Sequence, residues 1–151
     1  MAETEAVLDG IRVLDVASFI VGPAAATVLA DLGADVIKVE PPGSGDPYRN
    51  ALTGTNYPVC DRPYSWFVDN RNKRGIALDL KQDAGRDVLY RLAREADVFI
   101  TNMPLGVRER LRIRHEDIAP LNERLVYASV TAYGETGPEA GRTGFDSTVL
   151  W

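Results

Sequence analysis

The sequence is poor in the residues that build disulfide frameworks, zinc sites and histidine-based catalysis. Its 151 residues include one cysteine, Cys60, and one histidine, His115. A single cysteine excludes an internal disulfide and fits a reducing, cytoplasmic setting. One cysteine and one histidine are also too few ligands for a Cys/His zinc site. A Cys/His catalytic pair stays open, although isolated residues of this kind are more often a packed thiol and a surface imidazole. We therefore expect no metal.

Long apolar runs, clustered positive charge and a complete phosphate-binding motif are also missing. No stretch approaches the roughly 20 apolar residues that span a bilayer, and the acidic residues 1–7 form no signal peptide. The net charge of −5 argues against nucleic-acid and membrane-surface partners. The segment "GSGDPY" (residues 43–48) lacks the third glycine of a dinucleotide fingerprint, which favours a flexible surface loop. With 45% hydrophobic and 26% charged residues, the chain is typical of one soluble globular domain.

The sequence does contain short apolar runs that alternate with helical segments. Strands are predicted at residues 11–17, 35–40, 75–80, 97–101 and 125–132. Helices are predicted from Pro23 to a stop at Gly33, and over residues 64–74 (in part), 83–96, 106–113 and 115–122. The proline-rich residues 41–63 read as a loop. This alternation predicts an α/β fold with an open, mostly parallel, Rossmann-like sheet and helices on both faces.

In such a sheet, ligands bind beyond the carboxyl ends of the strands. The predicted ends are "SFIVGP", "EPPGSG", "DLK", "TNMP" and "AYGETG". Two basic segments could serve an anion: "NRNKR" (residues 70–74) is either a solvated turn or a phosphate clamp. The four arginines of residues 107–114 spread around a helix, so most of them are expected in solvent. Asp146, among glycines, looks catalytic but has no evident partner, which favours a turn residue.

Several segments, taken in order, resemble the family III CoA-transferases, which include formyl-CoA and carnitine CoA-transferase relatives and the 2-methylacyl-CoA racemases. They are "LDGIRVLD", "GPAAATVLADLGADVIKVEPPGSGDPYR", "NRNKRGIALDLK", "DVFITN" and "LVYASVTAYGETGPEAGRTGFD". Together they cover residues 8–146. The resemblance implies an acyl-CoA-handling enzyme, of which residues 1–151 are the N-terminal, CoA-binding, Rossmann-like part of the large domain.

The resemblance also implies which positions contact coenzyme A, all of them at or just beyond the predicted strand ends. Arg110 matches a phosphate-binding arginine, and "NKR" then looks structural or peripheral. The implied contact residues are Ile20, Val21, Pro41, Leu78, Asp79, Leu80, Lys81, Asn102, Met103, Pro104, Arg110, Thr143, Gly144, Phe145 and Asp146.

Three of these positions depart from the family pattern. Ile20 stands where formyl-CoA transferase has a glutamine, which implies a different polarity near the substrate. Pro41 stands where relatives can offer an arginine, so its charge must be replaced from elsewhere. Phe145 stands where racemases have a catalytic histidine, and because phenylalanine cannot abstract a proton, transferase chemistry is preferred.

The family's transferase mechanism uses an aspartate nucleophile that lies downstream of Trp151, so no catalytic residue is assigned within this chain. The small domain and the return of the chain to the large domain are likewise expected downstream, and Trp151 is expected to be a truncation. The resemblance implies acyl-CoA and a carboxylic acid acceptor as substrates, and a homodimer for the full-length protein. Two alternatives stay open: a non-catalytic CoA-binding subunit of a split enzyme, and a racemase or lyase of the same family.

Overall fold

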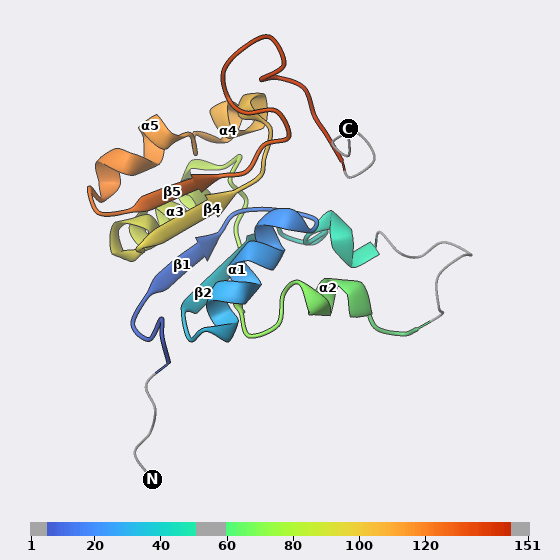
Figure 1. Cartoon of the computed structure of the whole chain (residues 1–151). Coiled ribbons are helices and arrows are strands. Elements are labelled where there is room, and N and C mark those ends of the chain that lie inside the picture. The colour runs from blue at the N-terminus through green and yellow to red at the C-terminus, as the bar shows by residue number, and fades with distance from the viewer. Residues whose placement is uncertain (1–5, 51–59, 146–151) are drawn as a thin grey trace.

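The computed structural model describes residues 6–50 and 60–145 of the chain. Its centre is a five-stranded sheet in which every strand pair is parallel, in the order β3-β2-β1-β4-β5 (Figure 1). The strands are β1 (Arg12–Asp15), β2 (Asp35–Glu40), β3 (Arg74–Ala77), β4 (Val98–Thr101) and β5 (Val126–Ser129). The chain builds outward from β1 to β3 and then returns to the other side of β1. The strand order therefore reverses between β1 and β4.

Helices cover both faces of this sheet, as predicted for the α/β class (Figure 1). They are α1 (Val21–Asp31), α2 (Tyr64–Val68), α3 (Asp83–Glu95), α4 (Leu105–Leu111) and α5 (His115–Ile118), with 3₁₀ turns η1 (Pro47–Asn50) and η2 (Ala119–Leu121). None of the helices in the described ranges is long and apolar enough to cross a membrane.

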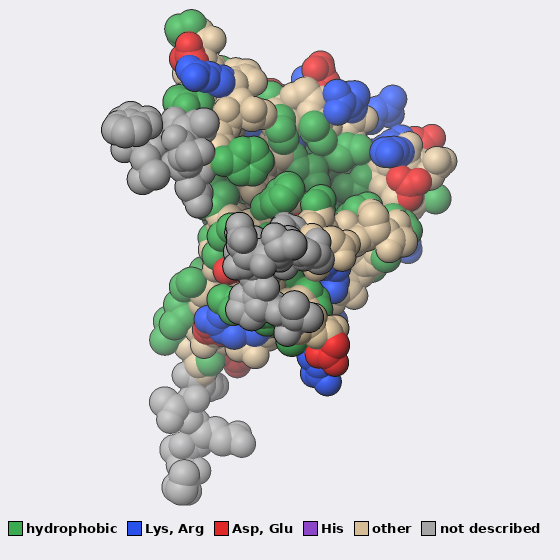
Figure 2. Space-filling model, turned by 90° about the vertical axis from the view of Figure 1, so that its right-hand side faces the viewer, with side chains coloured by type: hydrophobic (Ala, Val, Ile, Leu, Met, Phe, Trp, Pro, Cys, Tyr) green, Lys and Arg blue, Asp and Glu red, His purple; other side chains and the backbone are tan. Residues whose placement is uncertain are grey.

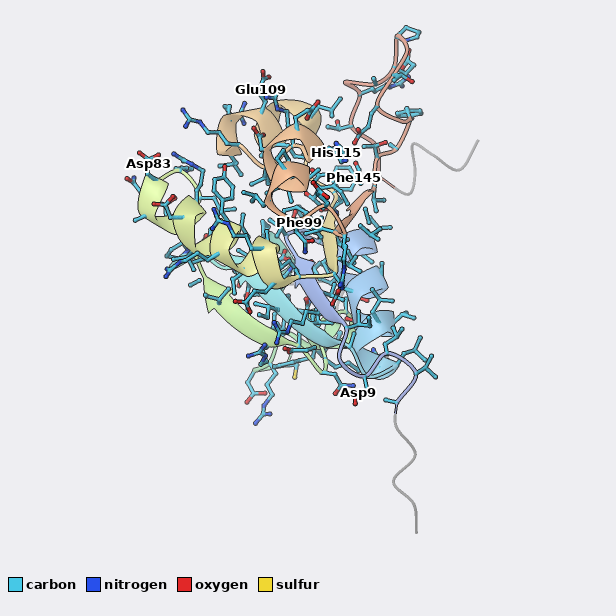
Figure 3. The ribbon with its side chains drawn as sticks, turned by 90° about the vertical axis from the view of Figure 1, so that its left-hand side faces the viewer. Asp9, Asp83, Phe99, Glu109, His115 and Phe145 are labelled. Carbon is cyan, nitrogen blue, oxygen red and sulfur yellow. The ribbon has the colours of Figure 1, made fainter. Side chains whose placement is uncertain are left out.

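Each central strand supplies side chains to two separate hydrophobic layers. On β1, Val13 packs toward α1 and the neighbouring Leu14 packs toward α3. On β4, Ile100 and Phe99 divide in the same way, and Phe99 lies near the centre of the α3 layer (Figure 3). Alternate side chains of a strand point to opposite faces, so strands buried on both sides need uninterrupted apolar runs. This requirement explains the runs that predicted the strands.

The predicted elements are present, with differences at their ends. Strand β2 coincides with the prediction, whereas the other four strands are shorter than predicted. Helix α1 begins at Val21, two residues before the predicted start at Pro23. A proline is tolerated in the first helical turn because the backbone N–H groups there have no partner within the helix. The early start brings Val21 and Gly22 into the helix.

Gly22 allows the first turn of α1 to approach the ends of β1 and β4 closely. A Cβ atom at this position would lie 2.4 Å from the Cβ of Ala17 and 3.5 Å from Cγ of Asn102. No side chain other than hydrogen fits at that distance. The glycine therefore fixes where the helix leaves the sheet.

Candidate functional site

The carboxyl ends of all five strands meet at one edge of the sheet, next to the loops that follow them. The arrowheads of β1 and β5 point toward this edge in Figure 1. Figure 2 looks onto it and shows hydrophobic side chains gathered in a hollow in the upper half of this face. In open parallel sheets, ligands bind at this edge where the strand order reverses, here between β1 and β4.

The loop between β1 and α1 lies at this reversal and is held by side chains from several elements. Asn102, just after β4, accepts a hydrogen bond from the Ser18 N–H (2.9 Å) and donates one to the Ser18 carbonyl (2.8 Å). The Phe19 N–H donates to Oδ1 of Asp46 (3.1 Å). Phe19 adopts a φ of 61°, which a bulky residue rarely does without an external constraint. The loop is thus a constrained structure.

A network of buried charges lies beneath this loop. Asp15 and Lys38 are neighbours in the register of β1 and β2, and both are almost completely buried. Nζ of Lys38 lies 2.8 Å from Oδ2 of Asp46 and 3.7 Å from Oδ2 of Asp15, and it donates to the Ala17 carbonyl (2.6 Å). Nζ of Lys73 lies 2.8 Å from Oδ2 of Asp15. The two cations balance the two carboxylates, which makes their burial tolerable.

Lys73 extends this network to the helices on the α1 side. Besides its ion pair with Asp15, it donates to the carbonyls of Pro23 (2.7 Å) and Asp69 (2.8 Å) and to Oδ1 of Asn70 (3.1 Å). Burial lowers the pKa of Lys73, and the nearby charge of Asp15 opposes that shift. Lys73 is therefore neither the solvated residue nor the phosphate clamp considered for "NRNKR". Its role is structural.

Apolar side chains project from the loop on the outer side. Ile20 and Val21 are 44% and 54% exposed, respectively, and Phe19 is 37% exposed. Phe145, far along the chain, meets the Phe19 ring edge to face with 6.0 Å between ring centroids. The structure thus brings the predicted contacts Ile20, Val21 and Phe145 to one place.

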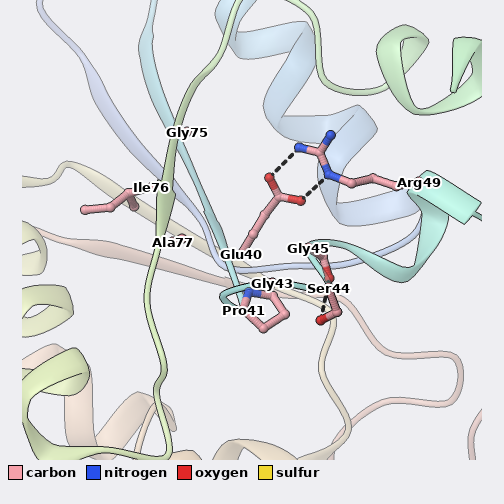
Figure 4. A pocket seen from close by; sticks show the side chains of 9 residues that line it. All are labelled: Glu40, Pro41, Gly43, Ser44, Gly45, Arg49, Gly75, Ile76 and Ala77. Carbon is pink, nitrogen blue, oxygen red and sulfur yellow. Dashed lines mark hydrogen bonds and ion pairs between the residues drawn. The ribbon is translucent and has the colours of Figure 1, made fainter. Parts of the chain in front are cut away.

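A second recess lies farther along the edge, where β2 and β3 end (Figure 4). It is an open cavity of about 450 Å³ lined by Pro41, the glycine-rich residues 43–45 and the end of β3. The Glu40 carboxylate forms a two-fold pair with Arg49, at 2.8 Å to Nε and 2.7 Å to Nη2. Burial alone would raise the pKa of Glu40, but the bonds from Arg49 and the Asp46 N–H outweigh it and lower the pKa. Arg49 also stacks over the Trp66 ring at 3.6 Å.

The arginines of α4 differ in burial, which their spacing along the helix did not predict. Arg108 is 1% exposed, donates from Nε to the Met103 carbonyl (2.7 Å) and pairs through Nη1 with Glu135 (2.6 Å). Ser129 donates to the same Glu135 carboxylate, and these two bonds lower the pKa of Glu135. Arg108 is the only fully buried one of the four arginines, since Arg110 and Arg112 are exposed and Arg114 is half-buried. Arg110, the predicted phosphate ligand, is exposed, and its guanidinium makes no hydrogen bond or ion pair with another described residue.

The remaining predicted contacts lie along the same edge with different accessibility. Leu78 and Leu80 are buried in the α3 layer, so only their backbone could face a ligand. Met103 packs partly against that layer, whereas Asp79 and Gly144 are half-buried. The exposed members of the set are Lys81, Pro104 and Thr143. Asp146 lies outside the described residues.

Comparison with known proteins decides the family. The model of CoA-transferase family III matches residues 8–150. The chain belongs to CoA-transferase family III.

Named relatives and solved structures agree with this assignment. An acetyl-CoA:oxalate CoA-transferase of Acetobacter aceti is 40% identical over 98% of this chain, and a succinyl-CoA:glutarate CoA-transferase of Homo sapiens is 39% identical over 94%. The crystal structure of a CAIB/BAIF family protein from Brucella suis superposes with a TM-score of 0.85 at 37% identity, over 96% of this chain and 38% of its own. The matched stretch covers only 37% and 32% of the two transferases. This family III chain therefore spans about a third of the length of these relatives.

Sequence reasoning missed the charged residues that hold this candidate site together. Asp15, Lys38, Asp46, Lys73 and Arg108 were not singled out as a group. A signal was available for Asp15 and Lys38, because each is a lone charge inside an apolar strand and buried charges need partners. No sequence signal pointed to Asp46, since its partners come from distant segments.

Two predictions about single segments need correction. Cys60 is exposed, with Sγ 3.7 Å from Oδ1 of Asp61, so the packed thiol is wrong. The "GSGDPY" loop is exposed at residues 43 and 44, but Asp46 is buried. That loop is anchored by its aspartate instead of being free. Within the ranges that the structure covers, no three His, Cys, Asp or Glu side chains cluster as a metal site would require.

Proposed function

We propose that this chain is the CoA-binding, N-terminal part of a family III CoA-transferase that moves CoA from an acyl-CoA to a carboxylic acid. The observation that carries the proposal is the family match over residues 8–150. Relatives at 38–40% identity are named for transfer from acetyl-CoA to oxalate and from succinyl-CoA to glutarate. A thioester donor and a carboxylate acceptor are common to these names, and the proposal is limited to that reaction class.

The proposed reaction runs through an aspartate supplied from beyond Trp151. Its carboxylate attacks the donor thioester, forming a mixed anhydride and releasing the CoA thiolate. The thiolate then attacks the aspartyl carbonyl, which releases the donor acid and leaves an aspartyl-CoA thioester. The acceptor carboxylate attacks that thioester, and the released thiolate takes the acyl group from the second anhydride. The aspartate is regenerated, and no metal takes part.

In this proposal, the residues of this chain bind and orient CoA. The constrained loop with Ile20 and Val21 lies at the reversal of strand order, where parallel sheets bind ligands. Arg110 is exposed and its guanidinium makes no bond to another described residue, so it can give charge-assisted hydrogen bonds to a phosphate. Phe145 has no proton to exchange, which favours transfer over racemisation.

Calorimetric titration of the 151-residue chain with CoA tests the binding role. We expect saturable heat, and an Arg110→Ala variant should bind at least about tenfold more weakly, since one charge-assisted hydrogen bond contributes about 1.5–3 kcal/mol. Arg94→Ala is the matched control, because Arg94 is exposed in the last turn of α3, near the opposite end of the sheet. Absence of heat from a chain that circular dichroism shows to be folded would contradict a preformed site.

A chimera tests the transferase assignment. The matched stretch of the Acetobacter aceti enzyme is replaced by this chain, so that the downstream part supplies the nucleophile. We expect transfer of CoA from acetyl-CoA to oxalate, measured by chromatography of oxalyl-CoA. A folded chimera that binds CoA but transfers none, beside an active parent enzyme, would count against the assignment. Racemisation of a 2-methylacyl-CoA by that chimera would favour the alternative.

A further inference from the structure

We propose that Asp46 is a positioning residue for the CoA-binding loop: its carboxylate holds Phe19 in a left-handed conformation and thereby sets the places of Ile20 and Val21. The functional half of this inference rests on the proposed function. Its structural half concerns one carboxylate and the groups around it.

Asp46 uses both of its carboxylate oxygens. Oδ1 accepts hydrogen bonds from the N–H groups of Phe19 (3.1 Å) and Tyr48 (2.9 Å). Oδ2 lies 2.8 Å from Nζ of Lys38, and the whole side chain is 1% exposed. One buried anion thus joins the loop after β1, its own loop after β2, and the strand between them. A carboxylate suits this place because it has two acceptor oxygens for the two N–H donors and a negative charge for the lysine.

The chain around Asp46 is built to deliver this carboxylate. The Asp46 N–H donates to Oε1 of Glu40 (2.7 Å), and Arg49 pairs with the same carboxylate, so residues 40–49 close on themselves. Gly45 adopts a φ of 65°, and a Cβ there would lie 2.9 Å from Cδ of Arg49 (Figure 4). The loop is therefore rigid at its base while residues 43 and 44 face solvent.

Phe19 is the residue of this loop whose backbone conformation needs an external constraint. Its neighbours Ala17 and Ser18 are fixed by Lys38 and Asn102, respectively, and α1 starts at Val21. A left-handed conformation costs a non-glycine residue free energy of order 1 kcal/mol. Without Asp46, nothing else among the described residues bonds the Phe19 N–H, and the backbone would return to a common conformation. That change would turn Ile20 and Val21 away from their places on the site.

Two charge-matched double variants separate this role from the general burial of charge. Lys38→Met with Asp46→Asn removes the ion pair but keeps an oxygen that can accept from the Phe19 N–H. Lys38→Met with Asp46→Ala removes the ion pair and the acceptor. Both leave no unpaired charge at these two positions, so a difference between them reports the acceptor alone.

Hydrogen exchange of the Phe19 and Tyr48 amides by NMR provides the first measurement, and it needs no ligand. We expect exchange at Phe19 to be at least about tenfold faster in the alanine variant than in the asparagine variant, with the amides of β1 and β4 protected alike. Equal exchange at Phe19 in the two variants would overturn the proposal. The exchange measurement tests the structural role of Asp46 even if the wild-type chain binds no CoA. Failure of the wild-type chain to bind CoA would contradict the proposed function only.

CoA titration of the same two variants provides the second measurement. We expect binding about tenfold weaker in the alanine variant, because part of the binding free energy must then restore the loop. Adding Phe19→Gly to the alanine variant should recover affinity, since glycine adopts positive φ without strain. If exchange differs but affinity does not, Asp46 holds the loop without serving CoA, and the positioning role is wrong.

Discussion

At the scale of single residues, burial separates side chains that look equivalent in the sequence. Arg108 and Arg110 lie two positions apart on α4, yet one is almost fully buried and the other is exposed. Arg108 reaches the Met103 carbonyl and Glu135 at the same time, which ties α4 to the loop after β5. Arg108 serves these two acceptors from two separate nitrogens, Nε and Nη1, whereas a lysine side chain carries only one nitrogen.

Replacing Arg108 by lysine should therefore destabilise the chain. We expect Arg108→Lys to lower the free energy of unfolding by about 1–3 kcal/mol, through loss of hydrogen bonds made by a buried charge. Urea denaturation followed by circular dichroism measures this. Arg110→Lys is the matched control and should change stability by less than about 0.5 kcal/mol. Equal effects at the two positions would contradict the burial of Arg108.

Glu40 should confer a pH dependence on stability. Its pKa lies below the ordinary value of 4.5 in the folded chain, so the carboxylate stabilises the fold above that value. The stabilisation, of about 1 kcal/mol for a partly exposed pair, is lost as pH falls through the lowered pKa. Denaturation at several pH values should show wild type more stable than Glu40→Gln near neutrality, with the difference shrinking below about pH 4. The exposed Glu123→Gln serves as the control; a constant difference for Glu40→Gln would be inconsistent with this pair.

At the scale of elements, the start of α1 depends on close contact between backbones. Gly22 lies against Ala17 and Asn102, where a methyl group has no room. Helix propensity alone would favour alanine at this position. Packing opposes helix propensity here. The 2.4 Å contact that an alanine Cβ would make with the Cβ of Ala17 outweighs the propensity gain.

Gly22→Ala should accordingly destabilise the chain by about 1–3 kcal/mol, because the first turn of α1 must move away from the sheet. Gly106→Ala is the control: this glycine lies in the first turn of α4 with nothing within 4 Å of the added carbon. That change should stabilise by up to about 1 kcal/mol. Thermal unfolding of both variants tests the pair, and stabilisation by both changes would show that α1 is not in tight contact with Ala17.

At the scale of the whole molecule, one sheet is shared by two hydrophobic layers. The α1 layer and the α3 layer use alternate residues of the same strands. Loss of packing in one layer must therefore weaken the other. The chain should unfold as one cooperative unit.

Leu89→Ala tests this coupling. Leu89 lies on α3 and is fully buried against the sheet, and its truncation should cost about 2–5 kcal/mol. Trp66 lies on α2, which is joined to α1 through the hydrogen bond from Thr27 to the Asp69 carbonyl. With Trp151→Phe in the background, Trp66 fluorescence and far-ultraviolet circular dichroism should shift together to lower urea. Fluorescence that stays at the wild-type midpoint would mean that the two layers unfold independently.

The sequence by itself determined the fold class, the position of the strands and the edge of the sheet where the strands end together. Those properties follow from local patterns: apolar runs that are buried on both faces, and the rule that parallel strands end together. The ordered motifs also identified the family. Tertiary structure alone decided that Asp46 reaches Phe19, that Lys73 meets Asp15 and that Arg108 is buried. These contacts join residues 27 to 58 positions apart, and no local pattern encodes them, because burial and charge pairing depend on which distant segments the fold brings together.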